Sequence, residues 1–493
     1  MGNGNWSAVF RVRRGIGHPI VRFCFPAWIR SHLSNWAQPM NHLNRRDLLE
    51  RAGKTGLGLA AGAAVHSMAA PARSADSAEK LTLAVVGIRG RGRQLASDFA
   101  SRNDCQVAYL CDVDESLFPE RVAEIEQIQG SAPTTVQDFR RALDDPSIDA
   151  IVCATPDHWH ALATVWACQA GKDVYVEKPV SHTPWEGRKM VEAARHYERI
   201  VQVGTQNRSA PYNHAAKAYL DEGHLGAIHM VRVYNQKFQP NAQSVPDGKV
   251  PGHLDWDMWT GPAQESEFNT NYQDRWNSFW RFSGGDIIND AVHQLDLARW
   301  LAGVDYPKSV YSTGGRFDEK GVFETPDTQV AVYEFNNLVM ILELTLYTPY
   351  MIKSDAALRN SDLHPHWPQN ATRIEIYGTQ GYMVVGRMGG GWQVFHRPRS
   401  RQPVVAAQEY GRFPDPEHKQ NFVDSVRSRQ TPNADIEQGH RSTLLCQYAN
   451  ISYRLGGRKL VVNPDNESFV RDEEACSLLK RDYRSPWVVP DRV

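Results

Sequence analysis

Lys178 is the side chain of this sequence best placed to do chemistry. It follows a short apolar strand in Asp173-Val-Tyr-Val-Glu177-Lys178-Pro179, and the proline restricts the chain directly after it. In a doubly wound sheet, ligands bind outside the carboxyl ends of the strands, which is where this lysine would lie. An ammonium fixed there can stabilise negative charge that develops on a substrate oxygen. The plain alternative is a solvated lysine at a strand end.

A histidine on a predicted helix is the second candidate. The helix spans residues 286–301, follows a Gly-Gly pair and ends before another glycine. At roughly 100° per residue, its apolar side chains gather on one face, and Asn289, His293 and Asp296 form a stripe roughly opposite. Such a stripe is either a solvated surface or the wall of a cleft, and the helix alone leaves both open. The ordinary pKa of histidine suits a general base near neutral pH.

A glycine-rich loop follows the first predicted strand. Residues 81–87 form an almost continuous apolar run, and Gly87-Ile88-Arg89-Gly90-Arg91-Gly92 comes next and opens a helix. Glycine permits tight turns and a close approach of the backbone to a pyrophosphate, whose charge the N-terminus of a helix favours. A glycine-rich loop alone is weak evidence. Here Asp112 ends the next strand roughly twenty residues on, which is the spacing of a dinucleotide site.

The choice between NAD and NADP rests on Asp112 and three arginines. A carboxylate at the end of that strand accepts a hydrogen bond from a ribose hydroxyl, which favours NAD. Arg89 occupies the place of the middle glycine in the usual fingerprint, and Gly90 stands one place later. With Arg91 and Arg93 beside it, Arg89 would also admit a phosphorylated ribose, so NADP stays possible.

Strands and helices alternate through residues 81–206, a pattern that predicts a doubly wound parallel sheet with right-handed crossovers. The predicted strands are residues 81–87, 107–112, 150–155, 174–177 and 200–204, and the predicted helices are residues 91–100, 115–129, 158–170 and 184–197. Thr155-Pro156-Asp157-His158-Trp159-His160 closes one strand and starts a helix. Two histidines two places apart on a helix do not share a face, so we expect no metal here and expect His160 to line the cofactor cleft.

After about residue 206 the pattern changes to longer strands in which apolar and polar residues alternate. Such alternation predicts a sheet with one covered face. The candidates are residues 228–236, 309–317, 328–335, 339–347, 373–377, 381–385 and 392–396. We place a first domain at residues 81–206 and a second at residues 207–490. Two helices are expected within residues 416–455, and the polar final stretch to Val493 is expected to wrap the surface.

An irregular stretch before the predicted 286–301 helix is rich in tryptophan. Aromatic faces and planar polar groups suit stacking on sugar rings and hydrogen bonding to them. We therefore assign substrate binding to Trp256, Trp276, Trp280 and Arg281. Packing of an irregular segment is the alternative for any single tryptophan.

Together these motifs resemble one known family. The glycine loop, Asp112, residues 155–160, Glu177-Lys178-Pro179 and Gly204-Thr205-Gln206 are similar to the Gfo/Idh/MocA oxidoreductases, which include glucose–fructose oxidoreductase and inositol dehydrogenase. The resemblance extends over residues 81–490. It implies an N-terminal Rossmann domain and a C-terminal α/β domain with a large open, mostly antiparallel sheet, and it implies contact between copies in a homo-oligomer. It also implies NAD(P)-linked redox chemistry on sugars and cyclitols.

The resemblance also implies roles for single residues. Lys178 would contact substrate and be catalytic, and His293 matches the histidine of a helical Asp-x-x-x-His pair that lies over the nicotinamide. The aspartate position of that pair is Asn289, which cannot stabilise an imidazolium by charge, so Asp290 is a candidate replacement. The residues expected at the cofactor are Gly87, Arg89, Gly90, Arg91, Gly92, Asp112, Thr155, Pro156, His158, His160, Glu177, Lys178 and Gln206.

The beginning of the chain is typical of an export signal. Asn44-Arg45-Arg46 precedes a weakly apolar run at residues 56–70, and Ala70-Pro71-Ala72 follows. A basic region, a short apolar run and small residues describe such a signal, and the paired arginines indicate the twin-arginine machinery. We expect residues 1–39 to be an over-extended start, residues 40–75 to be the signal, and the protein to reach the periplasm or cell envelope. A disordered arginine-bearing tail is the alternative.

Export by this route bears on the cofactor. The route carries folded proteins, often with cofactors in place, and nicotinamide cofactors are not expected outside the cytoplasm. We therefore expect a cofactor that does not dissociate and is recycled on the protein.

Composition excludes several classes of partner. The net charge is -1 with dispersed Lys and Arg, so no global field attracts nucleic acid or an anionic membrane. The apolar run at residues 56–70 is too short for a stable membrane span. None of the 7 cysteines forms a CxxC or a zinc-ligand spacing.

Three functions follow as hypotheses. The leading one is an exported NAD(P)-dependent oxidoreductase that transfers hydride between a sugar or cyclitol CH–OH carbon and a tightly held nicotinamide cofactor. The first alternative is a redox-neutral, NAD-dependent glycosidase, which oxidises a sugar, eliminates the glycosidic substituent and returns the hydride. The second is a catalytically silent sugar-binding protein, and retention of Lys178 and His293 argues against it.

Overall fold

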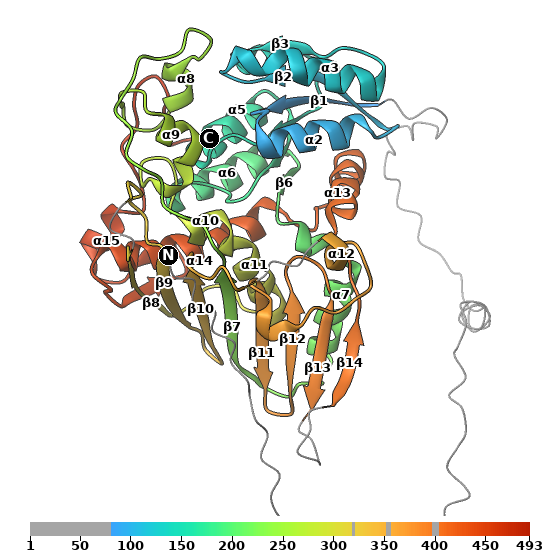
Figure 1. The fold of residues 1–493 in the computed structure, drawn as a ribbon, viewed down its shortest axis with the longest axis vertical. Coiled ribbons are helices and arrows are strands. Elements are labelled where there is room, and N and C mark those ends of the chain that lie inside the picture. The colour runs from blue at the N-terminus through green and yellow to red at the C-terminus, as the bar shows by residue number, and fades with distance from the viewer. Residues whose placement is uncertain (1–79, 318–320, 352–355, 397–403) are drawn as a thin grey trace, which may run out of the picture. The chain divides into compact units, whose positions relative to one another are not determined.

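The structure is a computed structural model that describes residues 80–317, 321–351, 356–396 and 404–493. The expected export signal at residues 40–75 and the segment 1–39 lie outside the described residues. All described residues fall within one compact unit, whose two β-sheets can be followed in Figure 1.

The N-terminal sheet has six parallel strands in the order β3-β2-β1-β4-β5-β6. They are β1 (Leu81–Val86), β2 (Cys105–Cys111), β3 (Thr134–Val136), β4 (Ala150–Cys153), β5 (Asp173–Val176) and β6 (Val201–Val203). Every residue of β4 and β5 is buried, as expected for a parallel sheet that helices cover on both faces. The predicted doubly wound sheet is confirmed.

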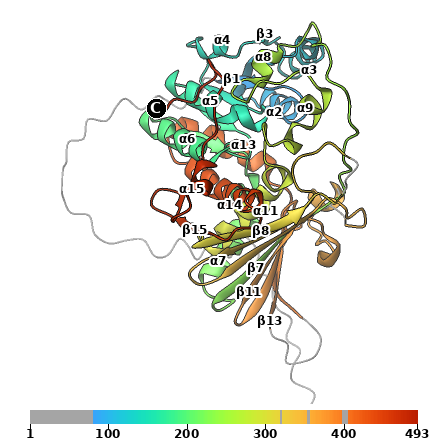
Figure 2. The ribbon, with the colours of Figure 1, turned by 90° about the vertical axis from the view of Figure 1, so that its left-hand side faces the viewer.

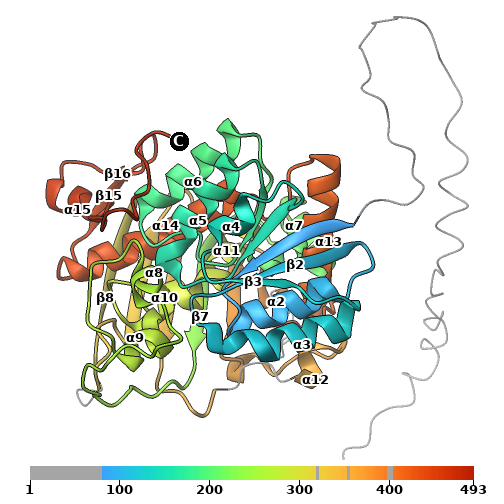
Figure 3. The same cartoon turned by 90° about the horizontal axis from the view of Figure 1, so that it is seen from above.

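Helices cover this sheet in two layers. In Figure 3, α2 (Gly90–Ala100) and α3 (Phe118–Gln129) lie on one side of the strands, and α5 (Asp157–Gln169) and α6 (Pro184–His196) lie on the other. The strand order reverses between β1 and β4, which creates a crevice outside their carboxyl ends. Gly87 follows β1, Thr155 follows β4 and Lys178 follows β5, so the predicted chemistry gathers at that crevice.

The C-terminal sheet has ten strands in the order β14-β13-β12-β11-β7-β10-β9-β8-β15-β16. Only the central pair β7–β10 is parallel among these strands of the described chain, so the predicted mostly antiparallel sheet is confirmed. The bounds are β7 (Ile228–Gln236), β8 (Ser309–Gly315), β9 (Thr328–Glu334), β10 (Val339–Thr345), β11 (Arg373–Gly378), β12 (Gly381–Gly386), β13 (Trp392–His396), β14 (Val405–Glu409), β15 (Leu460–Asn463) and β16 (Ser468–Phe469).

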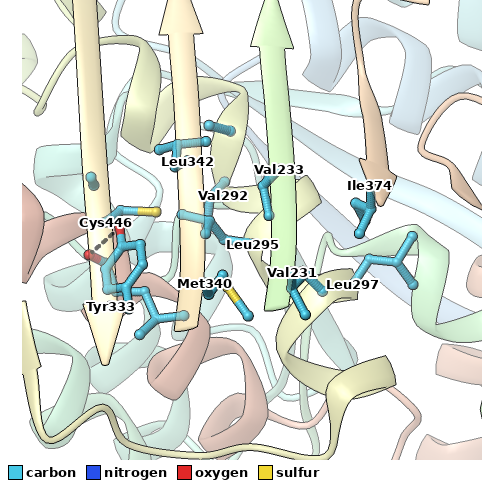
Figure 4. Close-up of a cluster of buried hydrophobic side chains, with 14 of the residues drawn as sticks. Val231, Val233, Val292, Leu295, Leu297, Tyr333, Met340, Leu342, Ile374 and Cys446 are labelled. Carbon is cyan, nitrogen blue, oxygen red and sulfur yellow. Dashed lines mark hydrogen bonds between the residues drawn. The ribbon is translucent and has the colours of Figure 1, made fainter. Parts of the chain in front are cut away.

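Helices cover one face of this sheet (Figure 2). They are α7 (Pro211–Asp221), α11 (Ala291–Ala302) and α14 (Ile436–Arg454), and α14 also contacts α6 of the N-terminal domain. Figure 4 shows how the core forms, because Val292 and Leu295 of α11 lie beside Val231 and Val233 of β7 and Met340 of β10. The apolar face of the 286–301 segment is therefore used to pack on the sheet, which turns the polar stripe toward the N-terminal domain.

The predicted helix over residues 286–301 is two helices. α10 (Asp286–Asn289) ends and α11 begins on either side of Asp290, whose backbone leaves the helical region at φ -123° and ψ -45°. Long-range ion pairs hold Asp290 in this break, with Lys237 Nζ 3.3 Å and Arg387 Nη2 3.6 Å from its carboxylate oxygens. Helical periodicity cannot reveal such contacts, because they come from other segments of the chain.

The expectation for the end of the chain is wrong. β15, β16 and α15 (Glu473–Ser477) form there, and Trp487 and Val489 are buried against the N-terminal domain. The Trp487 ring lies 5.4 Å from that of Trp159, measured between centroids. A single buried aromatic residue is enough to anchor a polar segment. The two predicted helices before it are confirmed as α13 (Asp415–Ser428) and α14.

Candidate functional site

Two adjoining pockets lie at the carboxyl ends of the parallel strands. A cleft of about 860 Å³ is lined by Lys178, Asn289 and His293 together with residues of α2 and α13. A smaller pocket of about 220 Å³ is lined by the glycine loop and Asp112. Arg91, Ala154, Thr155 and Trp276 line both, so the two pockets meet. A molecule with two unlike ends can therefore extend from one into the other.

The glycine loop is packed so tightly that it requires glycine. Gly87 has φ +81°, and a Cβ there would lie 2.8 Å from the Ala154 carbonyl oxygen. At Gly92 a Cβ would lie 1.6 Å from the Gly87 carbonyl oxygen, so the loop turns directly onto the first turn of α2. A Cβ at Gly90 would meet no atom within 4 Å, so this backbone at the N-terminus of α2 faces open space. That arrangement suits a pyrophosphate.

Asp112 lies where a ribose would bind. Its Oδ2 accepts a hydrogen bond from the Ile88 amide at 2.8 Å and its Oδ1 accepts one from the Asp114 amide at 3.0 Å. Burial raises the pKa of Asp112, and the two amides oppose that shift. Arg89 lines the smaller pocket and pairs with Asp114, Nη2 to Oδ2 at 2.7 Å.

The neighbouring arginines are also paired. Arg91 pairs with Glu177 and Asp415, and Arg93 pairs with Glu120 and Glu124. These carboxylates compensate the positive charge that would otherwise favour a phosphorylated ribose.

Lys178 is held by the backbone of the polar stripe. Its Nζ donates to the Asn289 carbonyl oxygen at 2.6 Å and lies 3.4 Å from Asn289 Oδ1. The ammonium is thus fixed at the end of α10, on the floor of the larger cleft, rather than solvated at a strand end. It retains further N–H groups that can bind a substrate oxygen.

His293 lies on the same cleft and is 5% exposed. Burial lowers its pKa well below the ordinary value, and the charges of Arg387 and Lys178 lower it further. Its Nδ1 has no hydrogen-bond partner among the described residues, and the Asn289 amide instead donates to Asp286 Oδ1 at 3.3 Å. His293 is therefore neutral near pH 7 and able to accept a proton.

Asp157 is a cleft residue that sequence reasoning treated only as a helix start. It is buried, lines the cleft, and accepts a hydrogen bond of 2.5 Å from Ser283 Oγ. Burial raises the pKa of Asp157 to about 6, against the charges of His160 and Lys178. A helix-starting aspartate usually faces solvent, so its position in sequence gives no sign of burial.

Several predicted site residues lie away from both pockets. His158 Nε2 lies 2.9 Å from the Trp259 carbonyl oxygen, and the His160 ring lies between the carbonyl oxygens of Pro179 and Thr155. The expected cleft position of His160 is therefore corrected: both histidines connect segments behind the cleft wall. Asp290 is directed toward Lys237, and it lines neither pocket.

Of the predicted sugar-binding residues, only Trp276 lines the cleft. Trp256 stacks on Trp259 with ring centroids 4.5 Å apart, Trp280 stacks on Tyr453, and the Arg281 guanidinium lies over Tyr272. These three positions are corrected, because packing of an irregular segment uses the same aromatic residues as a sugar site does. The remaining predicted residues Gly87, Arg89, Gly90, Arg91, Asp112, Thr155, Pro156, Glu177, Lys178, Gln206, Asn289 and His293 line one pocket or both, and Gly92 packs beneath the loop.

The residues present fit a dinucleotide. Open backbone at the start of a helix, a carboxylate at the end of β2 and a second pocket holding a cation and a neutral histidine are the contacts that such a cofactor needs. Within the described ranges, no group of three or more His, Cys, Asp or Glu side chains is placed to hold a metal. No helix in the described part of the chain is long and apolar enough to cross a membrane.

Comparison with known families agrees with this architecture. Residues 81–205 match "Oxidoreductase family, NAD-binding Rossmann fold", residues 213–384 match "GFO/IDH/MocA C-terminal domain", and residues 381–489 match "Oxidoreductase family, C-terminal alpha/beta domain". The three matches thus cover a Rossmann domain and a C-terminal α/β domain of one oxidoreductase family. The chain belongs to the Gfo/Idh/MocA family, as the motifs suggested.

Relatives with known names are distant. Levoglucosan dehydrogenase of Pseudarthrobacter phenanthrenivorans is 28% identical over 54% of this chain, and the match spans 62% of that protein. Myo-inositol 2-dehydrogenase of Thermotoga maritima is 21% identical over 74% of this chain and 94% of its own length.

Solved structures share the fold. A levoglucosan dehydrogenase in complex with NADH and levoglucosan superposes with a TM-score of 0.57 at 19% identity, over 78% of this chain and 99% of its own. The aldose-aldose oxidoreductase of Caulobacter crescentus gives 0.56 at 16% identity, over 78% of this chain and 100% of its own.

Proposed function

We propose that this protein is an NAD-dependent oxidoreductase that oxidises a CH–OH group of a sugar or cyclitol. The observation that carries the proposal is that Lys178 and His293 line one cleft, and that this cleft joins the pocket of the glycine loop. Dehydrogenase names among the relatives, with levoglucosan and inositol as their substrates, support the same reaction class.

Two residues of the chain would have separate roles in the reaction. A bound nicotinamide supplies the hydride acceptor. His293 is neutral and buried, so it accepts the hydroxyl proton as the carbon loses its hydride. The Lys178 ammonium, held by the Asn289 carbonyl oxygen, stabilises the negative charge that develops on the substrate oxygen. Removal of one such donor costs a reaction about a hundred- to a thousandfold in rate.

Two steps test this function. Native mass spectrometry of the purified protein is expected to detect a bound dinucleotide with the mass of NAD. Sugars and cyclitols are then added, and reduction of the nicotinamide is followed by its absorbance. If neither bound nor added NAD is reduced by any member of a broad panel, the proposed function is wrong.

A redox-neutral glycosidase is the second candidate, and Asn289 favours it. Asn289 carries no charge, so only Asp290 favours a protonated His293, against the charges of Arg387 and Lys178, and this alters the proton transfers that accompany net oxidation. Release of a phenol from an aryl glycoside without net reduction of NAD would select the glycosidase. Net reduction without phenol release would select the dehydrogenase.

We also propose that the protein is exported by the twin-arginine machinery and holds its cofactor without exchange. The support is the arginine pair at residues 45 and 46 ahead of a weakly apolar run. Residues 40–75 fused to a reporter are expected to direct it to the periplasm, and replacement of both arginines by lysine is expected to stop this. A reporter retained in the cytoplasm with the intact segment would contradict the proposal.

A homo-oligomer is proposed as well, through the uncovered face of the C-terminal sheet. Tyr311 and Val330 are 40% and 36% exposed on neighbouring strands of that sheet. Light scattering of the purified protein is expected to give a mass of at least two chains. A monomer at micromolar concentration would contradict this.

A further inference from the structure

Arg387 is a cleft residue that the proposed reaction does not use. It follows β12 directly, and the three glycines after Met388 all have positive φ, at +88°, +85° and +67°. This turn joins β12 to β13, and Arg387 lies on the wall of the larger cleft. Its side chain is only 7% exposed. A buried arginine at a cleft wall requires partners for five N–H groups.

The protein supplies this guanidinium with few partners. Among the described residues, its Nη1 donates to the Met388 sulfur, no oxygen atom accepts a hydrogen bond from its side chain, and its Nε is buried without a partner. The nearest carboxylate oxygen belongs to Asp290, 3.6 Å from Nη2, and Asp290 is shared with Lys237. Burial lowers the pKa of Arg387, and Asp290 opposes that shift. Buried charges without hydrogen bonds are rare, so the missing acceptor points to a ligand.

Two other cations of the cleft are paired with carboxylates. Arg91 pairs with Glu177 and Asp415, Nε to Oε1 and Nη2 to Oδ1 at 2.8 and 2.9 Å. Lys419 pairs with Asp98 and Asp415 at 2.8 and 2.7 Å. Arg387 differs from these residues because, within the described ranges, no oxygen accepts a hydrogen bond from its guanidinium.

The position of Arg387 limits which molecule supplies the acceptor. Arg387 and His293 line the same cleft, and the charge of Arg387 helps to lower the pKa of His293, so Arg387 lies near the residue proposed to take the proton. It belongs to the C-terminal domain, whereas the dinucleotide loop and Asp112 belong to the Rossmann domain. The acceptor is thus on the substrate, close to the carbon that reacts.

The hydrogen-bonding geometry of Arg387 favours a carboxylate as the acceptor group on the substrate. A guanidinium binds a planar carboxylate through two parallel hydrogen bonds. Asp290 contributes one negative charge at 3.6 Å, which favours a singly charged group over a doubly charged phosphate.

We propose that Arg387 recognises a carboxylate on the substrate, so that the sugar oxidised by this protein is a uronic acid or its glycoside. The oxidation of a uronic acid rests on the proposed function, whereas the binding of its carboxylate by Arg387 does not. Arg387 is then the residue that selects acidic sugars over neutral ones.

Matched pairs of substrates test the proposal. The NAD-loaded full chain is given methyl hexuronides and the corresponding neutral methyl hexosides in the gluco, galacto and manno configurations. At least one uronide is expected to be oxidised with a kcat/KM about ten- to a hundredfold above its neutral partner, the range of a charged hydrogen bond. Equal or better use of the neutral partners would overturn the proposal while leaving the proposed function intact.

Variants separate recognition from folding. Arg387→Gln is expected to lower the ratio of kcat/KM for the uronide to kcat/KM for its neutral partner by about ten- to a hundredfold, because any effect of the lost charge on His293 is common to both substrates. Arg458→Gln, which removes a charge that pairs with Asp472 outside the cleft, is the matched control and is expected to leave both kcat/KM values unchanged. If Arg387→Gln does not fold, Arg387→Lys keeps the charge but not the paired donors and is expected to retain only part of the preference. An equal loss for both substrates would overturn the proposal.

If no sugar is oxidised, a binding measurement still tests whether Arg387 recognises a carboxylate. Calorimetry on the NAD-loaded protein is expected to detect free glucuronate, galacturonate or mannuronate, and to lose that signal in Arg387→Gln. No uronate binding, or unchanged binding in the variant, would overturn the inference. Uronate binding without hydride transfer would instead refute the proposed function. Oxidation of a sulfated sugar in preference to every uronide would overturn the choice of a carboxylate.

Discussion

The small pocket and the large cleft are built in different ways. The small pocket is formed by close backbone packing at Gly87 and Gly92, and Asp112 is bonded to backbone amides. The cleft is formed by charged side chains from α2, β5, α10, the β12 turn and α13. Arg89 beside the pocket is neutralised by Asp114, whereas Arg387 on the cleft has no oxygen acceptor among the described residues.

This difference indicates that the large cleft determines substrate specificity, whereas the small pocket determines cofactor binding. A pocket made of backbone is fixed by local sequence and accepts one kind of ligand, a dinucleotide. A cleft made of side chains from distant segments can change its substrate by single substitutions. Variants that damage the two regions should therefore separate cofactor binding from turnover.

The largest expected effect comes from Lys178→Ala. Turnover is expected to fall by about a hundred- to a thousandfold, because a donor to the developing oxyanion is lost. Bound NAD, measured by mass spectrometry, is expected to remain at the wild-type level. Lys189→Ala removes a lysine that pairs with Glu192 on α6 and serves as the control. Wild-type turnover in Lys178→Ala would remove this residue from the mechanism.

The second effect is a pH dependence of stability that arises from Asp157. Its pKa is raised to about 6, so its contribution to stability is present at low pH and is lost as the pH rises through about 6. Relative to wild type, Asp157→Asn is expected to gain about 2.5 kcal/mol of unfolding free energy between about pH 4 and about pH 7. Denaturant titration of the cofactor-free protein at the two pH values measures this. A constant difference would show that Asp157 titrates normally.

A smaller effect distinguishes two glycines of the same loop. Gly92→Ala is expected to lower the unfolding free energy by about 1–3 kcal/mol, because its Cβ meets the Gly87 carbonyl oxygen. Gly90→Ala, with open space at its Cβ, is expected to match wild type in the cofactor-free protein. Thermal melts of both proteins provide the comparison. Equal melting temperatures for the two variants would contradict the loop geometry.

The smallest expected effect concerns the choice between NAD and NADP. Asp112→Asn keeps an oxygen for the Ile88 amide but removes the charge that repels a phosphorylated ribose. The ratio of kcat/KM for NAD to that for NADP is expected to fall by about tenfold, the effect of about 1.4 kcal/mol. Asp138→Asn removes a charge that pairs with Arg140 outside the pocket and is the control. An unchanged ratio would assign cofactor choice to another residue.

Local motifs predicted the fold and half of the site. Apolar strands that end in Gly87, Thr155 and Lys178 defined the crevice, because parallel strands bring their carboxyl ends to one edge. The polar stripe left a solvated surface and a cleft wall open, and the family resemblance placed His293 and Asn289 in the cleft; Asp296 of the same stripe is buried in an ion pair with Arg208. Hydrophobic periodicity predicts which residues share a face of a helix, but it does not predict which part of the protein covers that face.

The residues that the sequence did not reveal depend on long-range contacts. Arg387 reaches the cleft only through the turn after β12, and the run of glycines beside it was the one signal available. The break at Asp290 depends on Lys237, about fifty residues earlier in the chain, by an ion pair that no local pattern encodes. Tryptophans near the cleft were assigned to sugar binding although most of them pack together.

A determined structure of the protein with NAD and its sugar is the most direct test of the central claim, which is that Lys178 and His293 act on one carbon beside the nicotinamide. The expected result is that both side chains contact the oxygen of that carbon, with the carbon about 3–3.5 Å from the nicotinamide ring. A nicotinamide bound outside the cleft, or a sugar oxygen reached by neither side chain, would contradict the account.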